Sequence, residues 1–183
     1  MNLSTWCLVR VVAAAGLAAS TLGCGTLAAT HACSNEDVEA TLGQWEGATG
    51  SAFGFVVLAN RTDRPCELAG SPELRLIDAE GRLIAREPER PPVEGAPRVL
   101  LAPGSGPPEP DGARAGQASF SFLFGNVCDP LPDGQGRVEA RLPGEIAALV
   151  FAAEIPSPRC DSPLGSVGLG VQSFVSPAPI DQP

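Results

Sequence analysis

The sequence contains no lysine and no tyrosine, and its 183 residues include a single histidine. All twelve basic residues are arginines, and 21 acidic residues give a formal net charge of −9. Nucleic-acid binding needs clustered positive charge, so this composition argues against a nucleic-acid partner. The same acidity disfavours attraction to anionic lipid head groups, so we expect contact with a membrane only through a lipid anchor.

The sequence also lacks an apolar run long enough to cross a bilayer as a helix. Its apolar run at 11–23 follows Arg10 and suits the h-region of a signal peptide. Gly23-Cys24-Gly25 then resembles a bacterial lipobox, although Thr21 holds the place where leucine is usual. We expect lipidation of Cys24 and an extracytoplasmic, membrane-anchored protein. The alternative is cleavage after Ala32 and a secreted product without an anchor.

These signals predict a signal peptide at 1–23, a tether at 24–32, a β-sandwich domain at 33–175 and a flexible tail at 176–183. Of the six cysteines, we expect Cys7 to leave with the signal peptide and Cys24 to be acylated. The four that remain are Cys33, Cys66, Cys128 and Cys160, which allow three connectivities. Spacings of 33 and 32 residues favour sequential pairing. A zinc site is a weaker alternative, because no two of the four form a close C-x-x-C pair.

The mature chain predicts an all-β fold of about seven to eight strands. Residues 117–124 place Phe120, Phe122 and Phe124 on one face at period two. Residues 51–60 also alternate, and 73–85 predict a hairpin with its turn at 79–81. Further strands are expected within 98–104, 137–144, 146–155 and 169–175, although 146–155 has some helical propensity. Nineteen prolines and 21 glycines punctuate the chain at a spacing typical of a β-sandwich.

The connections between these strands carry the remaining signals. Residues 87–98 and 103–116 are rich in proline and acidic residues, and we expect solvated loops with polyproline character. Asn60, Asp63 and Pro65 predict a turn before Cys66. We therefore expect Cys66 to tie this corner of the sandwich to the segment at Cys33. Asn60-Arg61-Thr62 also matches a glycosylation sequon, which we interpret as part of the turn.

The pattern Asn60, Arg64-Pro65-Cys66, Leu68 and Gly70-Ser71-Pro72 resembles that of domain of unknown function 4232, found in exported and lipid-anchored bacterial proteins. Later features are also similar, namely Leu101-Ala102-Pro103-Gly104, the strand at 118–122, Cys128, Leu142-Pro143-Gly144 and Cys160. The resemblance extends from Cys33 to about Val175 and implies an immunoglobulin-like β-sandwich with two disulfides. It transfers no catalytic residue. Two departures, Ser71 in a place that is often aromatic and an insertion at 106–115, affect the surface rather than the fold.

Candidate catalytic and metal-binding residues are few. His31 lies in the expected tether, and we interpret it as a mobile linker residue rather than part of a nucleophilic mechanism. Asp129, Asp133 and Gly134 hint at a calcium loop but do not match the calcium-loop pattern, and turn chemistry explains them equally well. A glycosidase-like pair is conceivable among the loop carboxylates Glu87, Glu89, Glu94, Glu109 and Asp111, which are ordinarily solvated. The segment 165–170, GSVGLG, lacks the context of a phosphate loop and predicts a glycine-weakened strand.

We therefore expect no catalytic residue, no cofactor and no metal. The sequence favours a non-enzymatic domain that presents loops to an unknown extracytoplasmic protein or envelope component. Two alternatives stay open, a secreted hydrolase that uses the loop carboxylates and a purely structural envelope spacer.

Overall fold

The structure, a computed structural model, describes residues 30–44, 46–48, 51–86, 95–125, 135–154 and 168–177. Within these residues the chain forms twelve β-strands and no helix, which confirms the all-β prediction. Accordingly, none of the described segments is a helix long and apolar enough to cross a membrane.

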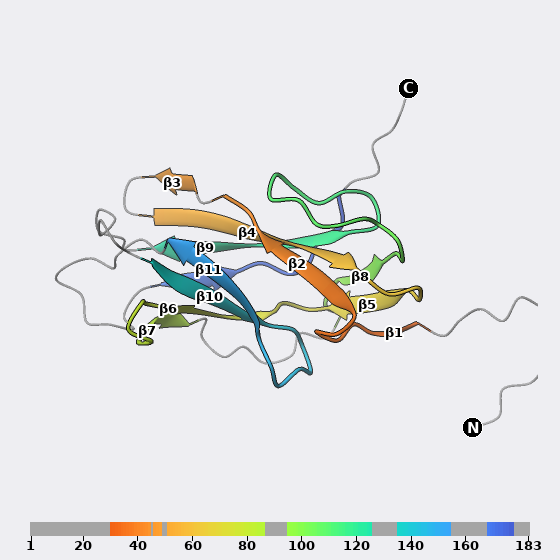
Figure 1. The fold of residues 1–183 in the computed structure, drawn as a ribbon, viewed down its shortest axis with the longest axis horizontal. Helices are drawn as coiled ribbons and strands as arrows, with labels where there is room; N and C mark the ends of the chain where they lie inside the picture. Colours follow the sequence, from red (N-terminus) through yellow and green to blue (C-terminus); the bar gives the residue numbers. More distant parts are fainter. Residues whose placement is uncertain are drawn as a thin grey trace, which may run out of the picture.

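The strands form three sheets (Figure 1). A five-stranded sheet contains β12 (Leu169–Val171), β9 (Ala118–Gly125), β4 (Ser51–Asn60) and β2 (Val38–Leu42) in that order, with β3 (Glu46–Ala48) also paired to β4. A four-stranded sheet contains β11 (Leu149–Glu154), β10 (Gln135–Arg141), β6 (Glu73–Ile77) and β7 (Leu83–Arg86). A three-stranded sheet contains β1 (His31–Ala32), β5 (Cys66–Ala69) and β8 (Arg98–Leu101).

One hydrophobic core draws side chains from all three sheets. The phenylalanine row of β9 is fully buried, as the period-two pattern predicted, and it packs with Val56 and Leu58 of the neighbouring β4. The four-stranded sheet contributes Leu74, Leu76 and Val138, among others. Burying several large apolar side chains, each stabilising by about 1.5–3 kcal/mol, is the main source of stability for this arrangement.

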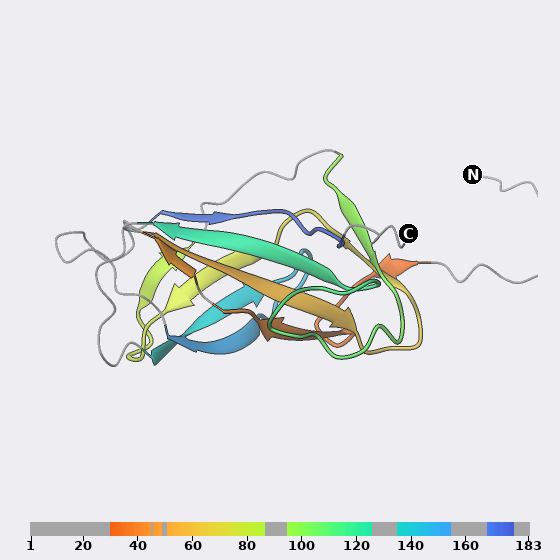
Figure 2. The ribbon, with the colours of Figure 1, turned by 90° about the horizontal axis from the view of Figure 1, so that it is seen from above.

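β4 and β9 run along the length of the molecule and form its central pair (Figure 2). Beside them, the ring of Phe55 lies over Gly43, where a Cβ atom would come within 2.3 Å of the ring. Gly43 also donates its backbone N–H to the Phe55 carbonyl at 2.8 Å. A glycine at position 43 therefore leaves room for the Phe55 ring where the chain after β2 continues beside β4.

The strands predicted from alternation are present, and β11 is a strand rather than a helix. The hairpin of β6 and β7 turns at 79–81, with Gly81 at a φ of 81°. Four strands were not predicted, namely β1, β2, β3 and β5. β1 starts at His31, two residues before the expected domain boundary at Cys33.

Candidate functional site

Several connections gather at the end of the molecule that holds β1, which we call the cysteine end: the turn at 33–37, the turn at 61–65 and the loop at 102–117. Arg61 donates its backbone N–H to the Asp37 carbonyl at 2.9 Å, which joins the two turns. An isolated bridge between Asn60 and Pro103 joins the second turn to the loop. Residues far apart in sequence are thus assembled into one continuous surface of connections.

The Cys33–Cys66 disulfide lies at this end, as the sequence predicted. Cys33 follows β1, Cys66 begins β5, and the two strands pair in parallel with His31 opposite Cys66. Cys33 is 5% exposed and Cys66 is fully buried, so both sulfur-bearing side chains belong to the hydrophobic core. Such burial is typical of a structural disulfide rather than one that exchanges with external thiols.

Asn60 explains why the chain turns after β4. Its side-chain amide donates to the carbonyls of Arg64 at 2.7 Å and Leu101 at 3.2 Å. Its side-chain oxygen accepts from the Thr62 backbone and hydroxyl, each at 2.8 Å. Since Asn60 is only 3% exposed, these bonds satisfy a buried polar group. The turn interpretation of this motif is confirmed.

His31 is not a mobile linker residue, and that prediction is wrong. Its Nε2 lies 3.3 Å from Oδ2 of Asp37. The same oxygen accepts from the Ser34 backbone N–H at 2.9 Å and from the Ser34 hydroxyl at 2.8 Å. The bond from the Ser34 backbone, helped by the other contacts, holds the pKa of Asp37 below its usual value despite partial burial.

The order of these three groups decides what they can do. In a hydrolase triad the histidine sits between the nucleophile and the carboxylate, so that it can take the hydroxyl proton. Here Asp37 lies between Ser34 and His31, and it accepts from both. The Ser34 hydroxyl therefore has a carboxylate partner and no imidazole base in contact with it. The cluster fixes the turn before β2 rather than activating a nucleophile.

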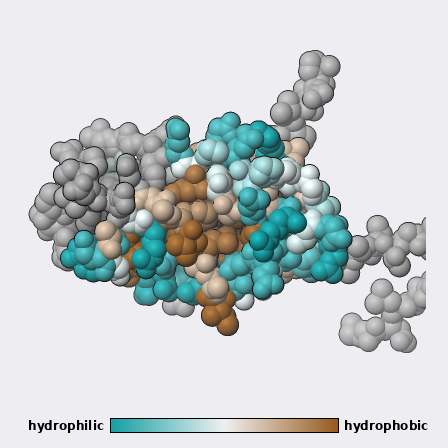
Figure 3. Space-filling model, viewed as in Figure 1, coloured by the Kyte–Doolittle hydropathy of each residue, from teal (hydrophilic) through white to brown (hydrophobic). Residues whose placement is uncertain are grey.

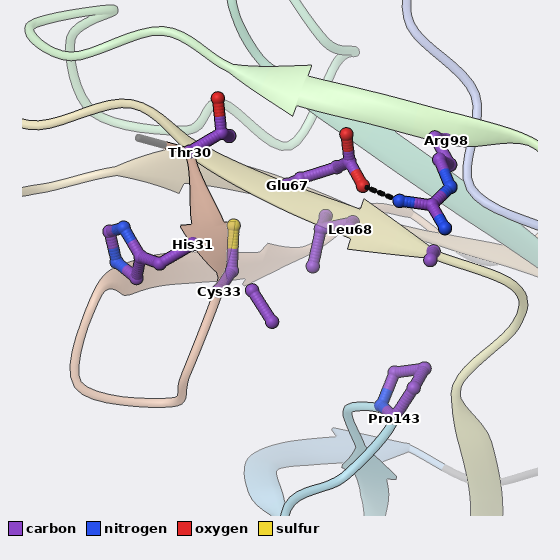
Figure 4. A pocket seen from close by; sticks show the side chains of 9 residues that line it. Thr30, His31, Cys33, Glu67, Leu68, Arg98 and Pro143 are labelled. Atoms are coloured by element: carbon purple, nitrogen blue, oxygen red, sulfur yellow. Dashed lines mark hydrogen bonds and ion pairs between the residues drawn. The ribbon is translucent and has the colours of Figure 1, made fainter. Parts of the chain in front are cut away.

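A hollow of about 340 Å³ lies beside the disulfide (Figure 4). It is bounded by β1, by Glu67 and Leu68 of β5, by Arg98 of β8, and by Pro143 of the β10–β11 connection. Glu67 and Arg98 form an ion pair of 2.6 Å at its edge. Figure 4 shows the His31 ring pointing away from this pair, so the hollow does not bring the imidazole beside the Glu67 carboxylate.

The loop at 102–117 differs most from its predicted form. Gln117 is fully buried, and its side-chain amide lies 3.2–3.3 Å from the carbonyls of three successive residues, Ser105, Gly106 and Pro107. Its side-chain oxygen accepts the backbone N–H of Arg114 at 3.0 Å. Pro108 is buried as well. For 103–116 the prediction of a solvated loop is confirmed, since Pro108 is its only buried residue, but the predicted polyproline character is wrong, because the loop forms turns that one glutamine side chain organises from inside.

The loop carboxylates do not form a catalytic pair among the described residues. Glu109 makes an ion pair with Arg114, and Asp111 is exposed at the tip of the loop. No group of three or more histidine, cysteine, aspartate or glutamate side chains in the described segments could hold a metal ion. Other predicted residues lie outside the described segments, namely Cys7, Cys24, Glu87, Glu89, Glu94, Cys128, Asp129, Asp133, Gly134 and Cys160.

An apolar edge occurs where β2 and β11 approach each other, near the centre of the face in Figure 3. Its partly buried members, Ala40, Leu42, Leu149, Phe151 and Ala153, pack against the core. Val150 on the outer face of β11 is 59% exposed, and Ile146 in the preceding connection is 93% exposed. The hydrophobic core comes close to the surface at this edge.

Sequence reasoning missed Gln117 and Asp37 as organising residues. Ser34 and Asp37, three positions apart, form a pattern that can signal a local turn bond. A single glutamine before a strand carries no comparable signal, because its partners are backbone carbonyls ten to twelve positions earlier.

The family described as Domain of unknown function (DUF4232) matches residues 33–106 of the chain. This confirms the resemblance inferred from the motif at 60–72 and covers β2 to β8, together with both cysteines of the disulfide. The resemblance was expected to reach Val175, whereas the match ends within the loop that follows β8. Neither the curated proteins nor the solved structures contain a match to the chain.

Proposed function

We propose that the chain is exported, anchored to the membrane by a lipid on Cys24, and non-enzymatic. In this proposal the fold is an immunoglobulin-like β-sandwich with a second disulfide between Cys128 and Cys160. Its role is to present the 102–117 loop to an extracytoplasmic protein or envelope component. The fold alone supports many functions, so the argument depends on the properties of the loop.

The observation that carries the proposal is the internal bracing of this loop by Gln117. The glutamine is fully buried, while Pro107, Pro110 and Asp111 at the outside of the loop are exposed. A loop held in one shape loses less conformational entropy when a partner binds it, which favours affinity. A loop that served only to connect β8 and β9 would not need fifteen or so residues, since most connections are much shorter.

The position of the loop suggests where the partner lies. β1 and the start of the loop are at the same end of the domain (Figure 1). Six residues, 25–30, lie between Cys24 and His31, so seven Cα–Cα steps join the two. A fully extended segment of that size spans about 25 Å at most. A lipid on Cys24 would therefore keep the loop close to the membrane surface, where the partner is expected.

The anchor is tested by the intact mass of the protein purified from its own producing cells. We expect a product that starts at a lipidated Cys24 and gains about 4 Da on reduction, since each of two disulfides takes up two hydrogens. An unlipidated product starting near Cys33 would refute the anchor. A gain of about 2 Da would refute the second disulfide while leaving the anchor intact.

The loop is tested by photo-crosslinking in the same cells. A photoreactive residue is placed at Asp111 in the loop or, as a matched control, at Asp63 in the neighbouring turn, which is also exposed. We expect one discrete crosslinked partner from position 111 and much less of it from position 63. Equal products from both positions, or none, would favour a structural spacer. A hydrolase would instead show turnover that Glu109→Gln abolishes.

A further inference from the structure

The outer face of the four-stranded sheet carries an unusual density of arginine for so acidic a chain. On β6, β7 and β10 the charged residues whose side chains the structure describes on this face are Glu73, Arg75, Arg86, Arg137, Glu139 and Arg141. Four arginines against two glutamates give these six residues a net charge of +2, whereas the whole chain has −9. The charge of these six residues therefore opposes that of the molecule.

A β-bulge places two of these arginines directly opposite each other. Ile77 of β6 pairs with Leu83 of β7. The pairing register then shifts by one residue between Ile77 and Leu76, so that Arg75 pairs with Arg86. Without the shift, regular antiparallel pairing would set Ala85 opposite Arg75. The bulge turns Ala85 into the core and brings Arg86 to the outer face beside Arg75. Like charges in directly opposite positions are destabilising, so this pairing is unfavourable by itself.

Arg75 lies at the centre of the arginine group. The Cβ atoms of directly opposite residues are about 5 Å apart, which is the separation expected for Arg75 and Arg86. On the other side, Arg75 pairs with Glu139, so Arg137 and Arg141 are its diagonal neighbours. Diagonal neighbours are separated by about 7–8 Å, which long side chains bridge easily. All four guanidinium groups can therefore reach one small area above Arg75.

The sheet already shows how an oxyanion fits between arginines here. Glu73 contacts Arg75 through one carboxylate oxygen at 3.2 Å and Arg141 through the other at 2.9 Å. Arg137 contacts Glu139 at 2.7 Å. Arg86 has no such carboxylate partner within the described part of the chain. Among the described residues, therefore, no carboxylate bridges the gap between Arg75 and Arg86 in the way that Glu73 bridges Arg75 and Arg141.

We propose that this gap binds a phosphate group, with Arg75 and Arg86 as its main ligands and Arg137 and Arg141 as flanking charges. Guanidinium groups bind phosphate through paired N–H donors. A phosphate has more oxygens than a carboxylate, so it can bridge two arginines and still accept from a third. The ligand is a free phosphate or a polymer of phosphate groups such as polyphosphate. This site is separate from the 102–117 loop, and its failure would leave the proposed function untouched.

The test uses calorimetric titration of the full mature chain at low salt with inorganic phosphate, polyphosphate and polyglutamate. We expect polyphosphate to bind, with inorganic phosphate competing for the same site, and polyglutamate of equal charge to bind at least about tenfold more weakly. The affinity should fall as salt rises, because exposed charges are screened. If free phosphate fails to displace polyphosphate, the site recognises the polymer. If free phosphate displaces it, the site recognises a single phosphate group.

Arg86→Gln and Arg82→Gln form a matched pair of variants. Both remove one positive charge from the β6–β7 hairpin, but Arg82 lies in the turn and already pairs with Asp78 at 2.7 Å. We expect Arg86→Gln to weaken polyphosphate binding about five- to tenfold and Arg82→Gln to change it less than twofold. Equal losses in the two variants, equal binding of polyglutamate, or no binding of phosphate at low salt would each overturn the site.

Discussion

The ring of Phe122 in β9 lies over Gly54 in β4, so close that a Cβ atom on Gly54 would come within 2.7 Å of the ring. The two residues are directly opposite each other in the central strand pair. Phe122 is fully buried and packs in the middle of the core. A side chain at position 54 would therefore have to displace the ring or separate the two strands.

The first prediction is that Gly54→Ala destabilises the protein by about 1–3 kcal/mol, because overpacking a filled core forces strain on its neighbours. Gly170→Ala in β12 is the control, since a Cβ atom there meets nothing within 4 Å and the backbone is not in the left-handed region. Urea unfolding followed by tryptophan fluorescence or circular dichroism measures both variants. Equal stability of the two alanine variants would contradict the close contact at Gly54.

The second prediction concerns the Cys33–Cys66 disulfide. Replacing both cysteines by alanine should destabilise the domain by about 3–4 kcal/mol, since the bond closes a loop of 33 residues in the unfolded chain. Both side chains are buried, so a smaller loss from the vacated volume adds to this effect. Urea unfolding under oxidising conditions is the measurement. A loss below about 1 kcal/mol would show that the bond does not constrain the unfolded chain.

The third prediction is that Gln117→Leu loosens the 102–117 loop. Leucine fills a similar volume but leaves the Arg114 N–H and the carbonyls of Ser105 to Pro107 without their partner. We expect a loss of stability of about 2–3 kcal/mol and faster amide hydrogen exchange confined to 103–116. Gln172→Leu is the control, because Gln172 is exposed and its side chain accepts a hydrogen bond from the Ser121 hydroxyl without bracing a loop. Unchanged exchange in the loop would refute the bracing role of Gln117.

The fourth prediction is a pH dependence that arises from Asp37. Its pKa is lower in the folded protein than in the unfolded chain, chiefly because it accepts a bond from the Ser34 backbone. The ionised carboxylate therefore stabilises the fold above the unfolded-state pKa of about 4, and this contribution disappears as the pH falls through the folded-state pKa. Asp37→Asn should cost about 1 kcal/mol at pH 7.

Urea unfolding at several pH values tests this prediction. The difference between the parent protein and Asp37→Asn should shrink steadily below about pH 4. Asp63→Asn, in an exposed turn, should stay close to the parent at every pH. A difference that persists at pH 2 would mean that the geometry of the amide, rather than the charge of Asp37, causes the loss.

Much of the fold follows from local pattern. β9 spans the phenylalanine row and buries one face at period two, and β4 spans the run at 51–60, which alternates at its start and is buried on both faces from Val56 onward. β1 and β5 have only two and four residues, too few for an alternation to be recognised. β1 forms because Ala32 pairs with Glu67 and the disulfide follows at once, which is a long-range effect.

The roles of the candidate-site residues were harder to predict from the sequence. A regular hairpin around the turn at 79–81 would set Ala85 opposite Arg75, and only the bulge brings Arg86 there. The burial of Gln117 depends on carbonyls that the loop itself folds around it. His31 looked mobile because its partner, Asp37, lies beyond the strand end and a turn. In each case a neighbour in space, not in sequence, determines the role of the residue.

The parallel pairing of β1 with β5 has a mechanical consequence. A pull on the N-terminus, directed along β1, would load its two backbone pairs in shear and then meet the Cys33–Cys66 bond in the next position. Tension would pass through that covalent link into β5 and its partner β8, instead of peeling β2 from the edge of the five-stranded sheet. The Cys33–Cys66 bond would therefore distribute a force applied at the N-terminal end over β5 and β8 as well as β1.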